Sequence, residues 1–257
     1  MIPALRLSHF DRLSNLKGES TMTFKSLFAG IVLTLMVTSL GWRAADSDDR
    51  AFTSTFHVDE ANLSSIGRNP YFILEPGFQQ YYEGKDGDKI VNLTITVLEE
   101  TKKVGNVETR VVEERETEGG KLVEVSRNYF AICKRTNNVY YFGEDVDMYK
   151  NGKVVSHDGS WLSGRDGAKF GLIMPGSPLL GARFQQEVAP NTAMDRSEIV
   201  SLSEKMETPA GTFENCLKTE ETTPLEPGDK ASKYYAEGVG LLKDGPVKLV
   251  RSGVIKK

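Results

Sequence analysis

The feature that most constrains this chain is an alternation of apolar and polar side chains between short turns. Residues 89–99 show it most clearly, because Val91, Leu93, Ile95 and Val97 alternate with Asn92, Thr94 and Thr96. A period of two that is rich in β-branched residues is typical of a β-strand with one buried face. We therefore predict a strand here, and not a helix.

Pairs of turn residues recur along the chain between such alternating segments. They are Asp86-Gly87, Gly105-Asn106, Gly119-Gly120, Asn137-Asn138 and Asn151-Gly152. Glycine and asparagine tolerate the positive φ angles that tight hairpins require. The spacing predicts an antiparallel meander of about six strands between residues 81 and 155.

The second half of the chain adds further short candidate strands, separated by Pro-Gly and Gly breaks. They cover residues 169–174, 182–188, 198–203, 212–222, 231–236 and 247–251. A flat sheet of so many strands would leave its edges and one apolar face exposed. The predicted fold is all-β, with the meander curled into a barrel, a half-barrel or a sandwich. Residues 69–257 are expected to form a single β domain.

The N-terminal region resembles a secretory signal peptide, expected at residues 22–41 as a helix. Lys25 precedes an apolar run over residues 27–41, and Ser39-Leu40-Gly41 fits the small-residue pattern of a cleavage site. The run is shorter than the ~20 residues of a membrane span; an uncleaved anchor is the alternative. Residues 1–21 are expected to be untranslated or disordered, and residues 42–68 to be flexible. The predicted location is periplasmic or secreted, with no stable membrane span after cleavage.

Charge and motifs exclude several function classes. The chain has 32 Lys and Arg against 36 Asp and Glu, a net charge of −4, so nucleic-acid binding is not expected. His57 and His157 alone follow the signal peptide, and no metal-ligand spacing accompanies them. Ser160 lacks the surroundings of a hydrolase nucleophile. No cofactor and no metal are predicted.

Residues 140–161 contain the candidate site. Parity places Glu144 on the same side of its strand as Tyr140 and Phe142, on the face that should be buried. A buried carboxyl must be hydrogen-bonded, paired or neutral, so Glu144 is the leading candidate for contact with a ligand. A bulge at Gly143 would instead expose it. Tyr140, Phe142 and Trp161 are the accompanying ligand-binding candidates.

Cys133 and Cys216 are the two cysteines of the chain. An oxidising compartment would permit a disulfide between them. Two unpaired thiols are the alternative, and parity places Cys216 opposite Phe213 and Leu217, facing outward.

Several segments together resemble a family of uncharacterised exported bacterial β-rich proteins. They are NPYF at 69–72, YFGEDV at 141–146, GSW at 159–161, GTFENCLKT at 211–219, TPLEPG at 223–228 and YYAEGVGL at 234–241. The resemblance covers nearly all of the chain after the signal peptide, and it implies export without implying an activity. In that family a polar or acidic residue is usual where Cys133 stands, which disfavours the disulfide.

Two functions are compatible with these observations. The preferred one is a non-enzymatic binding module for a small apolar ligand or an envelope partner, because no recognisable catalytic set is present. The alternative is a secreted carboxylate-dependent hydrolase that uses Glu144 with Asp145 or Asp158, which requires two carboxyls on one cleft. Whether the chain is an enzyme is left open, and a purely structural envelope protein is a third reading.

Overall fold

The structure is a computed structural model that describes residues 51–255. It is all-β, as predicted. The expected signal peptide at 22–41, the segment 1–21 and residues 42–50 lie outside the described residues. Within residues 51–255, no helix has the length and apolar character needed to cross a membrane.

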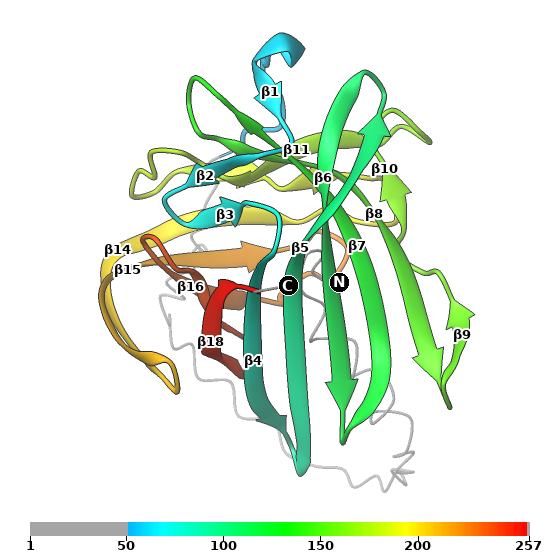
Figure 1. The fold of residues 1–257 in the computed structure, drawn as a ribbon. Helices are drawn as coiled ribbons and strands as arrows, with labels where there is room; N and C mark the ends of the chain where they lie inside the picture. Colours follow the sequence, from blue (N-terminus) through cyan, green and yellow to red (C-terminus); the bar gives the residue numbers. More distant parts are fainter. Residues whose placement is uncertain (1–50, 256–257) are drawn as a thin grey trace, which may run out of the picture. The chain divides into compact units, whose positions relative to one another are not determined.

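The predicted meander is confirmed (Figure 1). Its strands are β4 (Phe78–Asp86), β5 (Lys89–Val104), β6 (Val107–Glu118), β7 (Lys121–Cys133), β8 (Val139–Lys150) and β9 (Lys153–Ser156). Each pairs with its predecessor in antiparallel register, and every connection contains the Gly or Asn pair that the sequence indicates. Turn chemistry and alternation therefore agree along this half of the chain.

The second half forms β10 (Trp161–Leu162), β11 (Lys169–Met174), β12 (Arg183–Gln185), β13 (Glu187–Val188), β14 (Arg196–Thr208), β15 (Gly211–Thr222), β16 (Ala231–Ala236), β17 (Gly240–Asp244) and β18 (Val247–Val254). All join a single 16-stranded sheet, in the order β12-β14-β15-β16-β17-β18-β4-β5-β6-β7-β8-β11-β13. β9 and β10 are attached beside β8. The sheet is nearly closed into a barrel.

The N-terminal part of the described chain is also paired. η2 (Glu60–Asn62) precedes β1 (Leu63–Ser64), which joins the large sheet beside β7. β2 (Gly67–Asn69) and β3 (Phe72–Leu74) form a separate hairpin. The buried Asn69 amide donates to the carbonyls of Asn137 at 2.8 Å and Pro175 at 3.0 Å. Part of the segment expected to be flexible, residues 42–68, is thus held against the sheet.

One short stretch of chain joins the two ends of the large sheet. β12 and β13 are these ends, yet only Gln186 separates them in the sequence. Residues 183–185 pair with β14, and residues 187–188 pair with β11. The Gln186 side chain is 1% exposed and donates to Glu221 Oε1 at 3.0 Å. The chain therefore changes its pairing partner at Gln186, from β14 to β11. This change joins the two ends of the sheet, which would be free edges in an open sheet.

The strand β11 passes very close to this closing segment. A Cβ atom added to Gly171 would overlap with the backbone carbonyl oxygens of Gln185 and Gln186. Because backbone atoms cannot rotate away as a side chain can, only glycine fits at this position. The close approach at Gly171 therefore permits the closure.

We predict that Gly171→Ala lowers the free energy of unfolding by about 1–3 kcal/mol, the usual cost of overpacking. Urea denaturation would measure it. Gly87→Asn is the matched control, because a Cβ there meets open space and Asn tolerates the φ of 56°. Equal stability of Gly171→Ala and the wild type would show that the two ends of the sheet do not meet as described.

Candidate functional site

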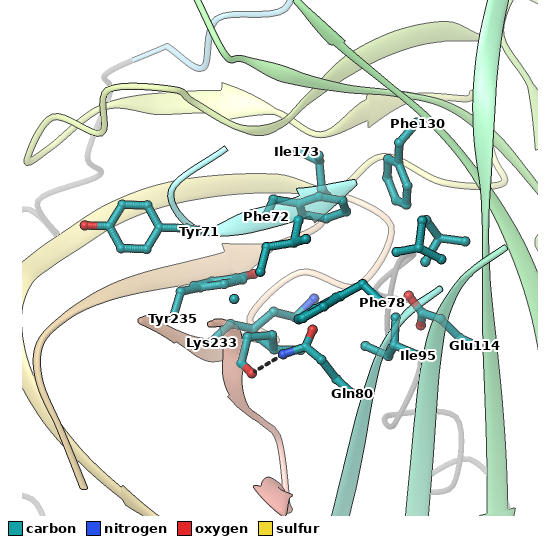
Figure 2. A pocket seen from close by; sticks show the side chains of 15 residues that line it. Tyr71, Phe72, Phe78, Gln80, Ile95, Glu114, Phe130, Ile173, Lys233 and Tyr235 are labelled. Atoms are coloured by element: carbon teal, nitrogen blue, oxygen red, sulfur yellow. Dashed lines mark hydrogen bonds between the residues drawn. The ribbon is translucent and has the colours of Figure 1, made fainter. Parts of the chain in front are cut away.

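The inner face of the sheet surrounds a small cavity of about 60 Å³ (Figure 2). Much of its lining is apolar and includes Phe72, Ile73, Phe78, Val112, Phe130 and Ile173. Sites for drug-sized ligands measure roughly 300–1,000 Å³, whereas a single water needs only about 10–15 Å³. As it stands, the cavity admits a molecule of only a few non-hydrogen atoms.

Glu114 is an acidic residue in this mostly apolar lining. It lies on β6 between Ile95 and Ser126, is 8% exposed, and lines the cavity. Its carboxyl makes no hydrogen bond to any other residue in the described range 51–255. Burial raises the pKa of Glu114 well above its ordinary value, despite the Lys233 ammonium nearby. Burial therefore favours the protonated carboxyl, which can donate a hydrogen bond.

Gln80 is a second polar group at the cavity, and its orientation is fixed by the backbone. Its amide nitrogen donates to the carbonyl oxygens of Val239 at 3.2 Å and Leu241 at 3.1 Å. Figure 2 shows Gln80, Lys233 and Tyr235 on one side of the cavity, with Phe72 and Ile173 on the other. Because both amide hydrogens are directed to carbonyls, the Gln80 side chain offers its oxygen as an acceptor.

Lys233 is the charged group of the cavity wall, and two carboxylates hold it. Its ammonium lies 2.8 Å from Glu221 Oε2 and 3.6 Å from Asp244 Oδ2. Burial alone would lower the pKa of Lys233, but Asp244 and Glu221 raise it well above its ordinary value. Glu221 also accepts from Gln186. A polar chain thus links the closing segment to the cavity wall.

A further acid pair lies beside the closing segment. Glu187 Oε1 accepts the backbone N–H of Asp195 at 2.6 Å, and the Gln186 N–H donates to the Asp195 carbonyl at 2.8 Å. Burial raises the pKa of both Glu187 and Asp195 well above their ordinary values. Two carboxyls that share one buried region cannot both ionise cheaply, so the charge of either one disfavours ionisation of the other.

Glu144 is buried at 1% exposure, as parity predicts, although it does not line the cavity. The bulge considered at Gly143 is also present, because Asn128 pairs with Glu144 while Phe130 pairs with Tyr141. Gly143 has a φ of 144°, which favours glycine. The bulge therefore leaves Glu144 buried.

The bulge nevertheless changes which side chains accompany Glu144. One extra residue on β8 places Tyr141 on its face, with the Tyr141 hydroxyl donating to Asn128 Oδ1 at 2.6 Å. Tyr140 and Phe142 lie on the other face, where both rings contact Phe170. The expectation that Tyr140, Phe142 and Glu144 share a face is therefore wrong.

Trp161 does accompany Glu144. The two residues are paired across β10 and β8, and the Trp161 ring meets Tyr141 edge-on with centroids 5.1 Å apart. Trp161 is buried but does not line the cavity. None of the four ligand-binding candidates from the sequence reaches the cavity lining.

The carboxylates named for hydrolysis are Asp145 and Asp158. Asp145 faces the opposite side of β8, where it accepts from the Tyr129 hydroxyl at 2.5 Å and pairs with Lys102 at 3.2 Å. Asp158 is exposed in the loop after β9. Glu114 and Glu187 are two acids that act electrostatically with Glu144.

Cys133 and Cys216 are both buried free thiols, so the disulfide is not formed. The expectation that Cys216 faces outward is wrong, because its side chain is fully buried. Asn215, with a φ of 54°, belongs to a bulge that places Cys216 on the face of Phe213. Alternation fails wherever such an extra residue enters a strand.

Within residues 51–255, no three or more His, Cys, Asp or Glu side chains are grouped so as to hold a metal ion. Comparison with protein-family models, curated proteins and solved structures gives no match to this chain. The resemblance to exported bacterial β-rich proteins therefore stays a prediction.

The sequence reasoning missed Glu114 and Lys233. The sequence did contain a signal for Glu114. It lies two residues after Val112, so alternation along a strand places the two side chains on the same face. The sequence gives a weaker indication that Lys233 is buried. Its neighbours Ser232 and Tyr234 are polar or amphipathic, so alternation does not show which face of the strand is buried. Its burial depends on Glu221 and Asp244, which are distant in sequence.

Buried acids with raised pKa values should make the free energy of unfolding fall as the pH rises. Burial and Glu124 raise the pKa of Glu116 from 4.5 to about 8. The folded state therefore binds this proton more tightly than the unfolded state. The resulting stabilisation is complete below pH 4.5 and is lost as the pH rises towards 8.

We predict that Glu116→Gln, which mimics the protonated acid, gains stability relative to the wild type between pH 5 and pH 8. The upper limit is about 1.4 kcal/mol per pH unit for one group. Urea denaturation across this range would measure it, with Glu83→Gln on the exposed face of β4 as the control. Parallel curves for the wild type and Glu116→Gln would contradict the prediction.

Proposed function

We propose that this chain is an exported, non-enzymatic binding protein whose interior cavity takes a small ligand. The observation that carries the proposal is Glu114, a buried acid with a raised pKa and no hydrogen-bond partner among the described residues, which lines a mostly apolar cavity. A buried polar group that is left unpaired costs free energy. A ligand that accepts its hydrogen bond would recover that cost.

The lining indicates the chemistry of such a ligand. Apolar side chains around Glu114 favour an apolar body, while the Glu114 hydroxyl and the Gln80 oxygen supply one donor and one acceptor. An alcohol or an amide carries both complementary groups. The volume of about 60 Å³ limits the ligand to a few non-hydrogen atoms.

Export is the second part of the proposal. It rests on the signal-peptide pattern of residues 22–41 and on the resemblance described above. The ligand would then be a small molecule or an envelope component met in the periplasm or outside the cell. The carboxylate hydrolase stays an alternative prediction, and Asp145 faces the opposite side of β8 from Glu144, where it accepts a hydrogen bond from Tyr129.

The test is ligand-observed NMR with a defined set of small probes, namely alcohols, amides and hydrocarbons of about two to five carbons, chosen to suit the cavity volume. We predict that some alcohols or amides bind and that Ile95→Phe, which fills the cavity, abolishes their binding. Ile90→Phe is the matched control, because Ile90 lies on the same strand and is 47% exposed.

A second variant tests the role of Glu114. Glu114→Gln keeps the shape of the side chain but replaces the acidic O–H with an amide, so we expect the ranking of the probes to change. The proposal fails if no probe binds the wild type, or if Ile95→Phe binds the probes as the wild type does.

A further inference from the structure

A second hollow lies on the opposite face of β4, β5 and β6. It measures about 410 Å³ and is lined by Tyr81, Asn92, Thr94, Thr96, Arg115 and Thr117, among others. Each lining residue alternates with a side chain that faces the interior, as Tyr81 does with Gln80 and Tyr82. Its volume lies within the roughly 300–1,000 Å³ that small-molecule sites occupy.

Amide and hydroxyl groups form a connected array across this groove. The Tyr81 hydroxyl donates to Asn92 Oδ1 at 2.7 Å, and Asn92 Nδ2 donates to Thr117 Oγ1 at 3.4 Å. On the neighbouring row, Gln79 Nε2 donates to Thr96 Oγ1 at 3.0 Å. Each amide keeps a second N–H, and each threonine keeps its own hydroxyl proton, so donors and acceptors alternate across the groove.

Two charged contacts fix the borders of the groove. The Arg251 guanidinium lies 4.3 Å from the centre of the Tyr81 ring, which holds the ring in place. Glu113 pairs with Arg127 at 3.2 Å and with Arg115 at 3.7 Å. The lining itself contains one acid, Glu113, and one cation, Arg115, so the lining has no net charge.

We propose that this groove binds a neutral carbohydrate chain. Sugar hydroxyls both donate and accept, as the groups of the groove do, and the C–H face of a pyranose ring can pack against Tyr81. Leu98 is the one aliphatic residue of the lining, so the groove does not suit a lipid. An extended peptide cannot add to β5 by backbone hydrogen bonds, because β4 and β6 already occupy both of its edges.

The test is an NMR titration of the full chain with neutral oligosaccharides: β-1,4-glucan, chitin, α-1,4-glucan, xylan and mannan fragments. We expect at least one of them to shift the backbone amide signals of Thr94, Thr96 and Thr117. Asn92→Ala should weaken that sugar's binding by about tenfold, since it removes groups that bond the ligand and hold Tyr81. Asn106→Ala, in the exposed β5–β6 turn, should leave the affinity unchanged.

Far-ultraviolet circular dichroism would establish that Asn92→Ala is folded, and Thr94→Ala provides a second, smaller change in the same groove. The proposal is overturned if no oligosaccharide shifts these amides, or if Asn92→Ala and Thr94→Ala both bind as tightly as Asn106→Ala. It is also overturned if sedimentation shows a dimer that Tyr81→Ala dissociates, since the groove would then contact a second copy. Because the groove and the interior cavity share no residue, either proposal can fail alone.

Discussion

Polar side chains inside a closed sheet have little water to bond with, and the interior of this protein is arranged around that constraint. Lys233 remains charged because Glu221 and Asp244 surround it, and Glu221 in turn bonds Gln186 of the closing segment. Burial raises the pKa of Glu114 well above its ordinary value, although the Lys233 ammonium acts in the opposite direction. Burial inside the sheet therefore raises the pKa of an interior acid, and a chain of polar contacts links Lys233 to the closing segment.

The same strands supply two chemically different surfaces. On the inner face, β4, β5 and β6 contribute apolar side chains together with Gln80 and Glu114. On the outer face, they contribute the amide and hydroxyl groups around Tyr81 and Asn92. A period of two separates these sets within each strand, so neither face needs residues from the other. The proposed interior ligand and the proposed exterior ligand would therefore contact different side chains.

Much of the fold could be predicted from the sequence because turn residues and alternation are local signals. The hairpins at Asp86-Gly87 and Asn151-Gly152 form where the sequence places them. Two kinds of information were missing. Bulges at Gly143 and Asn215 each add one residue and reverse the parity beyond it, which misassigned Tyr140, Phe142 and Cys216. The partner change at Gln186 joins strands distant in sequence, and no local pattern reports it.

The central claim is that closure buries Glu114 as a neutral acid beside an apolar cavity. The most direct test is a carbon-13 NMR titration of the Glu114 carboxyl, assigned with the Glu114→Gln variant. The account predicts that this resonance keeps its protonated shift at pH values well above 4.5, the ordinary pKa of the group. A Glu114 carboxyl that titrates near 4.5 would contradict it, because the interior would then be open to water.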